Sequence, residues 1–428
     1  MQRIIVVGAS LGGLRAAEAV RAAGFGDELL VIGEEPWLPY NRPPLSKEAL
    51  AGGIGQERLE LHRRRSVQDA RWLLGTPVVA ADLRARTVTL SDGTNYDWDG
   101  LVVATGLRAR RLTVPDPDGG PAPAAGRHVL RTLDDAVSLR GALRPGARGV
   151  VIGAGFVGCE VAATAVGLGC RVVMVAPEEY PLLRALGPLV GAALGRRHAR
   201  HGVRLLLGRS PVALEPAAGQ PGRVGRFGRV GAVLLDDGGR VPADVVVEAI
   251  GCVPNVEWLR GTGLDLSDGV LTDELLRAIG DDGVVRPDVV AVGDVARFPN
   301  SLVDEVPRRV EHWSVPTDTA RRAGPVLVAG LNGGGPGGGG PGGGGSGGPP
   351  GAVKPILPSF WSDQYGERLQ SFGMPSLADE VRLLGGDPDG EFVAGYLRDG
   401  RLLGAAGIGL LPRLLGLREE LLTPRTSP

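Results

Sequence analysis

The sequence lacks the paired cysteines that redox disulfides and most sulfur-ligated metal sites require. Its three cysteines are Cys159, Cys170 and Cys252, and none of them belongs to a CxxC or CxxxxC motif. The cysteine pattern therefore predicts neither a metal site nor a redox disulfide. We expect Cys159 and Cys170 to be buried as small hydrophobic side chains, on and just after a helix.

Long apolar runs and an excess of one charge are also missing. The 428 residues carry a formal net charge of −1, which gives the chain no general attraction to nucleic acid or membranes. A chain of this length and apolar content is typical of a globular protein with two or three domains. Arg, Glu or Gly interrupts each apolar helical segment early, and no signal-peptide pattern follows Met1. We therefore expect a cytoplasmic protein with no nucleic-acid or membrane partner.

Lysine is nearly absent from the chain. Lys47 and Lys354 are the only lysines among 47 basic residues. Because arginine is used almost wherever a cation is present, a retained lysine is a candidate for a role that arginine cannot fill. Lys354 lies in an expected loop, where chance explains it. Lys47 ends a proline-rich loop and is the more informative of the two.

Two glycine-rich turns are the most informative features that the sequence does contain. Each follows a short apolar strand, within residues 4–24 and 149–169, and opens directly into a helix. The unpaired N–H groups and positive dipole end of such a helix favour a pyrophosphate. Two such turns indicate an enzyme that passes electrons from a bound nicotinamide nucleotide to a bound flavin. The candidate turn residues are Gly8, Ser10, Gly12 and Gly13, and then Gly153, Gly155, Val157 and Gly158.

The residues that would read the ribose differ between the two turns. Glu34 ends the strand after the first turn, where a carboxylate can accept both ribose hydroxyl groups. An ordinary solvent-facing glutamate is the alternative. The corresponding second strand ends at Ala176, with Glu178 and Glu179 next and no arginine before Arg184. Because acidic side chains repel a 2′-phosphate, we expect NADH rather than NADPH.

The order of the expected elements predicts an α/β fold. It has two Rossmann-like dinucleotide-binding domains, for FAD and NAD, and a small α+β C-terminal domain. We expect a discontinuous FAD-binding domain at 1–113 and 245–331, and an NAD(P)-binding domain at 114–244. Residues 332–351 are almost wholly Gly, Pro and Ser, which predicts a flexible linker. Residues 352–428 would form a C-terminal interface domain.

Several motifs occur in the order seen in a known family. They are PYNRPPLSK (39–47), VVATG (102–106), the second GxGxxGxE, AIGxxPN (249–255), GDVA (293–296) and EHW (311–313). In these residues the chain resembles the FAD-dependent, NAD(P)H-using ferredoxin and rubredoxin reductases that serve bacterial monooxygenases and dioxygenases. The resemblance covers the chain except about 114–126 and 332–351. PYNRPPLSK is specific to this group and its near relatives.

The resemblance implies roles for individual residues. Arg42 and Lys47 would lie against the flavin, and Glu160 would sit on the nicotinamide side and pair with Lys47. Asp294 would hold the ribityl hydroxyl groups, helped by the N-terminus of the next helix. Further implied FAD contacts are Val78 through its backbone, Arg131, and Trp313 and Trp361 beside the isoalloxazine. Glu178 and Gly251 complete the candidate cofactor-binding set.

Elementary electrostatics agrees with a lysine at position 47. A reduced flavin is anionic, so a fixed ammonium group stabilises it and shifts its potential. Burying that ammonium requires a partner, which Glu160 offers. The alternative for Lys47 is a plain cation at a helix start. For Trp313 and Trp361 the alternative is core packing.

The resemblance implies hydride transfer from NADH to FAD, followed by single-electron transfer to an iron–sulfur ferredoxin. The protein would supply positioning and electrostatics. A cysteine-dependent reductase is nearly excluded, because residues 41–47 and their surroundings contain no cysteine. A partner-binding redox flavoprotein similar to apoptosis-inducing factor stays open. Arginine clusters at 63–65 and 108–111 could steer an acidic ferredoxin, or simply be solvated faces.

Overall fold

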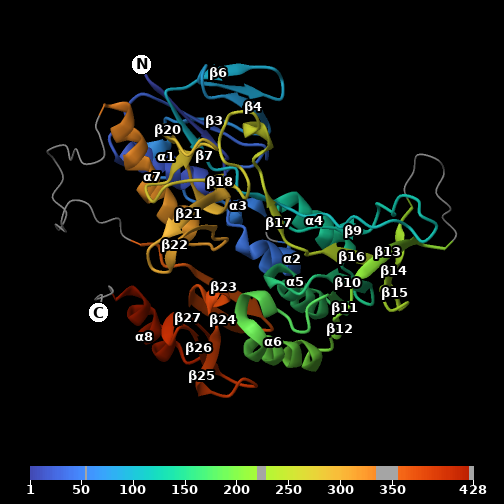
Figure 1. Cartoon of the computed structure of the whole chain (residues 1–428). Coiled ribbons are helices and arrows are strands. Elements are labelled where there is room, and N and C mark those ends of the chain that lie inside the picture. The colour runs from blue at the N-terminus through green and yellow to red at the C-terminus, as the bar shows by residue number, and fades with distance from the viewer. Residues whose placement is uncertain (54, 219–227, 334–354, 424–428) are drawn as a thin grey trace. The chain divides into compact units, whose positions relative to one another are not determined.

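The computed structural model describes all residues except 54, 219–227, 334–354 and 424–428 (Figure 1). The predicted linker at 332–351 therefore lies almost entirely outside the described residues. The chain divides into two compact units, each built from three segments. Unit 1 comprises Met1–Asn41, Glu60–Arg108 and Pro254–Ser359, and unit 2 comprises Arg42–Leu59, Ala109–Val253 and Phe360–Pro428.

A six-stranded sheet in the order β19-β20-β7-β1-β2-β3 forms the centre of unit 1. All its neighbouring strands pair in parallel except β19, which is antiparallel at one edge. The four apolar residues that end β1 are all buried, as expected for a parallel strand covered on both faces. The strands are β1 (Arg3–Val7), β2 (Glu28–Ile32), β3 (Arg71–Leu73), β7 (Gly100–Val103), β19 (Arg277–Ile279) and β20 (Val285–Ala291).

Two helices of unit 1, α1 (Leu11–Ala22) and α7 (Val315–Leu331), lie side by side (Figure 1). Gly324 permits their close approach, because a Cβ atom there would overlap Ala19. Two small sheets complete the unit: β4 (Val78–Asp82), β5 (Thr87–Leu90) and β6 (Asn95–Asp97), and β18 (Val270–Leu271), β21 (Ala296–Asn300) and β22 (Asp304–Arg309). Its 3-10 turns are η2 (Arg65–Val67), η3 (Glu257–Leu259) and η4 (Gly293–Val295).

Unit 2 contains a second parallel sheet, in the order β12-β11-β10-β16-β9. Its strands are β9 (Arg127–His128), β10 (Arg148–Ile152), β11 (Arg171–Ala176), β12 (Arg204–Leu207) and β16 (Val245–Glu248). The associated helices are α4 (Leu133–Ala142), α5 (Phe156–Gly167) and α6 (Leu183–Arg200). An antiparallel sheet of β13 (Pro211–Pro216), β14 (Val230–Leu235) and β15 (Arg240–Pro242) packs its apolar residues against β10 and β16.

The C-terminal part of unit 2 is an antiparallel sheet in the order β23-β24-β27-β26-β25, followed by a helix. These elements are β23 (Ser359–Gln364), β24 (Glu367–Gly373), η5 (Pro375–Leu377), β25 (Glu380–Gly386), β26 (Phe392–Arg398), β27 (Arg401–Ile408) and α8 (Leu411–Leu422). The sheet is held to α6, because the buried Arg197 pairs with Glu367 at 2.8 Å and the Tyr396 hydroxyl donates to the Leu186 carbonyl at 2.8 Å.

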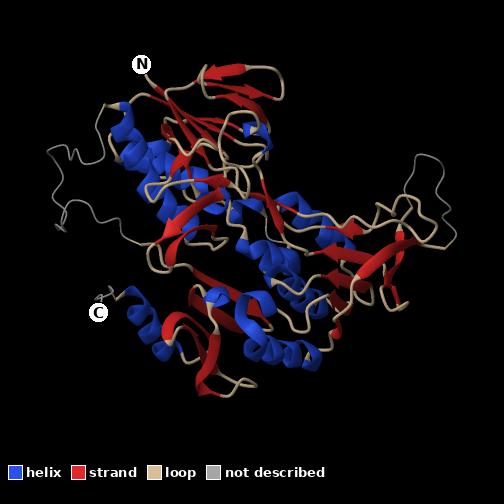
Figure 2. Ribbon diagram, viewed as in Figure 1, coloured by secondary structure: helices blue, strands red, loops and turns tan. Residues whose placement is uncertain are grey.

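Residues 42–59 belong to unit 2, although the sequence places them within the first segment of the expected FAD-binding domain. They form η1 (Pro43–Ser46), α2 (Glu48–Gly52) and α3 (Gln56–Leu59), and α2 packs on α4 and α5. The short strands β8 (Leu107–Ala109) and β17 (Cys252–Pro254) pair where the chain passes between the units. Both units contain helices and strands (Figure 2). Within the described ranges, we find no helix that is both long and apolar enough to cross a membrane.

Candidate functional site

Two glycines of the first glycine-rich turn, Gly8 and Gly13, leave no room for a side chain. Gly8 follows β1 with φ +116° and donates its N–H to the Ile32 carbonyl at 2.8 Å. A Cβ atom at Gly8 would overlap the carbonyl oxygen of Ala104, and one at Gly13 would overlap that of Gly8. The backbone at these two glycines therefore carries no side chain, and α1 begins within the turn, with Ser10 as its N-cap residue. This geometry fits a dinucleotide pyrophosphate.

Other candidate residues of unit 1 gather at the same end of the sheet. Asp294 lies in η4, and the N–H of the preceding Gly293 donates to Thr319 Oγ1 of α7 at 2.9 Å. A Cβ atom on Gly12 would come within 3.8 Å of Pro316, so the first turns of α1 and α7 are neighbours. The exposed Glu34 lies just beyond β2, and Val78 begins β4. Two helix starts and two carboxylates fit the phosphate and sugar groups of FAD.

The second turn, in unit 2, repeats this construction. Gly153 has φ +103°, and a Cβ atom there would overlap the Ala249 carbonyl oxygen. A Cβ atom on Gly158 would overlap the carbonyl oxygen of Gly153. Gly155 instead is exposed at the start of α5, with open space where its Cβ would be. Val157 is exposed in the first turn of α5, and Gly251 is exposed after β16 with φ +95°. The residues present fit a second pyrophosphate.

The structure adds a cation at the end of β11, where the sequence predicts that the ribose of the second dinucleotide binds. Ala176 is fully buried, while Glu178 is half-buried and Glu179 exposed. Arg184 of α6 lies 2.7 Å from the Glu178 carboxylate, with 83% of its side chain exposed. A cation is therefore present beside the first acidic residue, because the start of α6 brings it back to the end of β11.

The structure contains the expected ion pair between Lys47 and Glu160. Lys47 Nζ lies 2.8 Å from Glu160 Oε2, and the two side chains are only 11% and 8% exposed. Lys47 follows η1, and its ammonium group also donates to the Pro43 carbonyl at 3.0 Å. Breaking such a buried pair by removing one partner would cost about 3–5 kcal/mol. Lys47 precedes α2 (Glu48–Gly52), so it does lie at a helix start, but its ammonium group is buried in an ion pair. Its role toward the flavin stays a prediction.

Sequence reasoning missed three hydroxyl groups around this pair. Ser46 Oγ donates to Glu160 Oε2 at 2.5 Å, and Ser362 Oγ donates to Glu160 Oε1 at 2.7 Å. Thr164, one helical turn after Glu160, donates to the Ser46 carbonyl at 2.7 Å. Ser46 lies within PYNRPPLSK and could have been found there. No sequence signal marks Ser362, which lies on β23 of the C-terminal sheet.

Arg42 and Arg131 are brought together in unit 2. Arg42 Nη1 donates to the Arg131 carbonyl at 2.6 Å. The Arg131 N–H donates to Asp135, which closes the capping box of α4 with Thr132. Trp361 also belongs to unit 2, where the Arg368 guanidinium lies 5.9 Å from the centre of its ring. Their roles toward FAD stay predictions.

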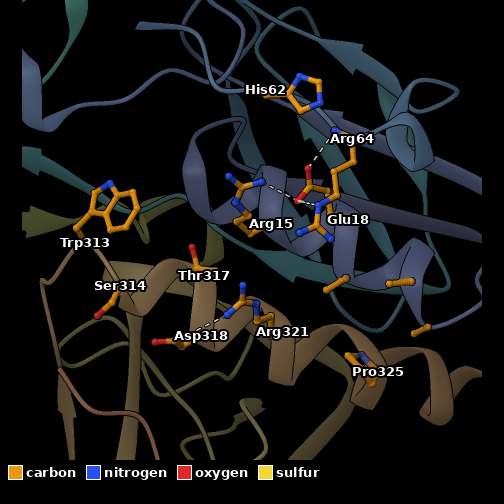
Figure 3. A pocket seen from close by; sticks show the side chains of 13 residues that line it. Arg15, Glu18, His62, Arg64, Trp313, Ser314, Thr317, Asp318, Arg321 and Pro325 are labelled. Atoms are coloured by element: carbon orange, nitrogen blue, oxygen red, sulfur yellow. Dashed lines mark hydrogen bonds and ion pairs between the residues drawn. The ribbon is translucent and has the colours of Figure 1, made fainter. Parts of the chain in front are cut away.

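A surface pocket of about 650 Å³ lies between α1 and α7 in unit 1 (Figure 3). Trp313 stands at one end of it, 42% exposed, with its Nε1 donating to Asn41 at 3.2 Å. The charged residues that line the pocket are Arg15, Arg64, Arg321, Glu18 and Asp318. Glu18 is buried and pairs with Arg15 at 2.7 Å. Positive charge therefore predominates on the exposed rim.

The cysteines do not form a redox centre. In the described residues, which include all three cysteines, none forms a disulfide. Complete burial raises the pKa of the Cys159 thiol, and burial also raises the pKa of Cys170. Thiols held in the protonated form are poor nucleophiles. Both side chains are buried, as the sequence predicts.

Comparison with known proteins gives a match over nearly the whole chain. Residues 2–320 match the pyridine nucleotide-disulphide oxidoreductase family, and residues 359–427 match a reductase C-terminal domain. The ferredoxin–NAD(+) reductase component of the anthranilate 1,2-dioxygenase system of Burkholderia cepacia is 36% identical, over 99% of this chain and 95% of that protein. Putidaredoxin reductase of Pseudomonas putida is 33% identical, over 94% and 87%.

Solved structures agree with the sequence relatives. Putidaredoxin reductase, in its covalent complex with putidaredoxin, has a TM-score of 0.84 and 31% identity, covering 98% of this chain and 93% of that one. A ferredoxin reductase from Rhodopseudomonas palustris has a TM-score of 0.80 and 30% identity, covering 97% and 93%. These matches confirm the predicted fold class and the resemblance drawn from the motifs. The chain therefore belongs to the pyridine nucleotide-disulphide oxidoreductase family, and it is an oxidoreductase that uses FAD and NAD(P)H.

Proposed function

We propose that this chain is the reductase component of an oxygenase system and passes electrons from NADH through FAD to an iron–sulfur ferredoxin. The observation that carries the proposal is that each unit contains one glycine-rich turn in which two glycines have no room for a Cβ atom. Each turn suits the pyrophosphate of one dinucleotide. The relatives named as ferredoxin reductase components support the acceptor. They do not favour the alternative of a flavoprotein that acts mainly through partner binding. Turnover with NADH and an added ferredoxin would test the proposal.

In this function FAD supplies the capacity to accept a hydride and to release electrons singly. The residues of the chain bind and orient the two nucleotides. The amides after Gly8 and Gly153 would hold the pyrophosphates, and Asp294 would hold the ribityl chain. Lys47 is oriented by Glu160 and the Pro43 carbonyl, which take two of its three N–H groups. Within the described residues the third N–H has no acceptor, so it would be available to a flavin edge.

We further propose that NADH is preferred over NADPH. Glu178 is half-buried at the ribose-reading end of β11, where its carboxylate repels a 2′-phosphate. The Arg184 partner weakens this repulsion, because it neutralises part of the Glu178 charge at 2.7 Å. We therefore expect a moderate preference.

The wild-type kcat/KM should favour NADH by roughly tenfold, as one or two unfavourable charge contacts near a surface would produce. Glu178→Ala should reduce this ratio, because it removes the acid and frees Arg184 for a phosphate. Glu179→Ala is the matched control and should change the ratio less, since Glu179 is exposed. Steady-state kinetics with both nucleotides is the measurement. A wild-type preference for NADPH would contradict the proposal.

The pocket between α1 and α7 is our proposed docking site for an acidic ferredoxin. Arg64 and Arg321 carry side chains that are 63% and 69% exposed on its rim. They share the pocket with Trp313, an aromatic side chain that suits a protein interface. Exposed charges of one sign mainly accelerate association with a partner of opposite charge.

Replacing both Arg64 and Arg321 with glutamine should lower kcat/KM for ferredoxin about tenfold at low ionic strength. The loss should shrink as salt is added, because screening removes the same attraction from the wild type. Reduction of a small acceptor such as ferricyanide should be unchanged. Arg84→Gln, at an exposed arginine of the same unit outside the pocket, is the control. An equal loss with both acceptors would argue against docking at this surface.

A further inference from the structure

We propose that Ser362, on the first strand of the C-terminal sheet, is a positioning residue for the Lys47–Glu160 ion pair. The inference rests on the proposed function, because it gives Ser362 a part in hydride transfer from NADH. Ser362 is fully buried and donates a hydrogen bond of 2.7 Å to Glu160 Oε1. The C-terminal sheet thereby contributes a hydroxyl group to a pair whose two members lie far earlier in the chain.

The direction of this hydrogen bond follows from a second neighbour. Gln364 Nε2 donates to Ser362 Oγ at 3.0 Å, so the serine oxygen is the acceptor there. A hydroxyl group has one hydrogen, and an ionised carboxylate can only accept. The Ser362 hydrogen therefore points to Glu160. If the oxygen and nitrogen of the Gln364 amide were exchanged, Ser362 Oγ would lie between two acceptors, Gln364 Oε1 and Glu160 Oε1. Its one hydrogen could satisfy only one of them, which disfavours that orientation.

The two oxygens of Glu160 receive different donors. Oε2 accepts from Ser46 at 2.5 Å and from Lys47 at 2.8 Å, whereas Oε1 accepts from Ser362. The terminal torsion of a glutamate has a broad energy minimum, so hydrogen bonds and not rotamer preference set the carboxylate plane. Without the Ser362 hydroxyl the plane can rotate, and Oε2 moves relative to Lys47. Ser362 thus orients the ammonium group through Glu160.

A matched control exists on the neighbouring strand of the same sheet. Ser371, on β24, is 1% exposed, and its hydroxyl makes no hydrogen bond to any described residue. Ser371→Ala and Ser362→Ala remove the same atom from equally buried positions. They differ in whether that atom reaches Glu160.

Stopped-flow reduction by excess NADH is the first measurement. Ser362→Ala should lower the limiting rate about tenfold, as is typical when a supporting hydrogen bond is lost, with little change in the Kd for NADH. Ser362→Thr, which keeps the hydroxyl, should restore most of the rate, and Ser371→Ala should match the wild type. In a Glu160→Gln background, Ser362→Ala should have little further effect, because residues that act through one another are not additive.

Amine labelling of the FAD-free protein gives a readout independent of activity. Lys47 and Lys354 are the only lysines, so mass spectrometry can follow each one, with Lys354 as the internal reference. Lys47 should label several-fold faster in Ser362→Ala than in the wild type or Ser371→Ala. Gln364→Met, which removes the side-chain amide that donates to Ser362, should have a smaller effect in the same direction and serves if Ser362→Ala does not fold.

Wild-type labelling and wild-type reduction rates in Ser362→Ala would overturn the positioning role. The same result in Ser362→Ala and Ser371→Ala would also overturn it, because it would indicate a general packing effect. A wild-type protein that NADH does not reduce would instead overturn the proposed function. The labelling experiment would then still decide whether Ser362 holds the pair.

Discussion

Replacing Lys47 with arginine is expected to slow flavin reduction by NADH on the order of a hundredfold, while FAD stays bound. The formal charge does not change. However, the ammonium group occupies a buried position between Glu160 Oε2 and the Pro43 carbonyl. A guanidinium group is wider than an ammonium group and donates its hydrogen bonds in a fixed planar fork. It must therefore displace either these two partners or the flavin and nicotinamide rings between which hydride would pass. Stopped-flow bleaching of the flavin absorbance by excess NADH measures the effect.

The same substitution at Lys354, the other lysine of the sequence, is the control for this experiment. It should leave both the FAD content and the rate of reduction unchanged. Glu160→Gln should resemble Lys47→Arg, because it leaves the ammonium group without its charged partner. Equal reduction rates for the wild type and Lys47→Arg would remove Lys47 from the reaction and leave the ion pair with a structural role alone.

Alanine in place of Gly8 and in place of Gly153 should separate the two cofactors. Each glycine has a positive φ, and each added Cβ atom would overlap a carbonyl oxygen of the neighbouring strand's extension, at Ala104 and Ala249. Strain of about 1–3 kcal/mol at such a position corresponds to a loss of affinity of roughly 5- to 150-fold. Gly8→Ala should lose FAD and its yellow colour. Gly153→Ala should keep FAD and bind NADH weakly.

Gly24→Ala and Gly202→Ala are the controls for backbone strain. Both glycines have a positive φ, and an added Cβ atom would meet nothing within 4 Å. These variants should lose some stability and retain both cofactors. The ratio of flavin to protein absorbance and a titration with NADH are the measurements. Loss of FAD from Gly153→Ala with retention in Gly8→Ala would reverse the assignment of the two turns.

The dinucleotide turns could be predicted from sequence because their chemistry is local. A strand, a glycine without room for Cβ and a helix start lie within a few residues of one another, as at Gly8–Gly13 and Gly153–Gly158. Motif order likewise pointed to Lys47 and Glu160 as partners, and they lie 2.8 Å apart. Fold class and family follow from the same short patterns.

Only the tertiary structure places residues that meet across long stretches of chain. Ser362 reaches Glu160, Arg184 reaches Glu178, and residues 42–59 pack with unit 2 and not with the segment that precedes them. None of these contacts has a local sequence signal, because the partner of a buried hydroxyl group or of an arginine side chain depends on which distant residues the fold brings beside it. The sequence by itself determined that this protein uses FAD and NAD(P)H, since the turns that bind their phosphates are built from neighbouring residues. The tertiary structure decided how the Lys47–Glu160 pair is held, since the donors to Glu160, Ser46 and Lys47 on one side and Ser362 on the other, come from two segments far from it in the sequence.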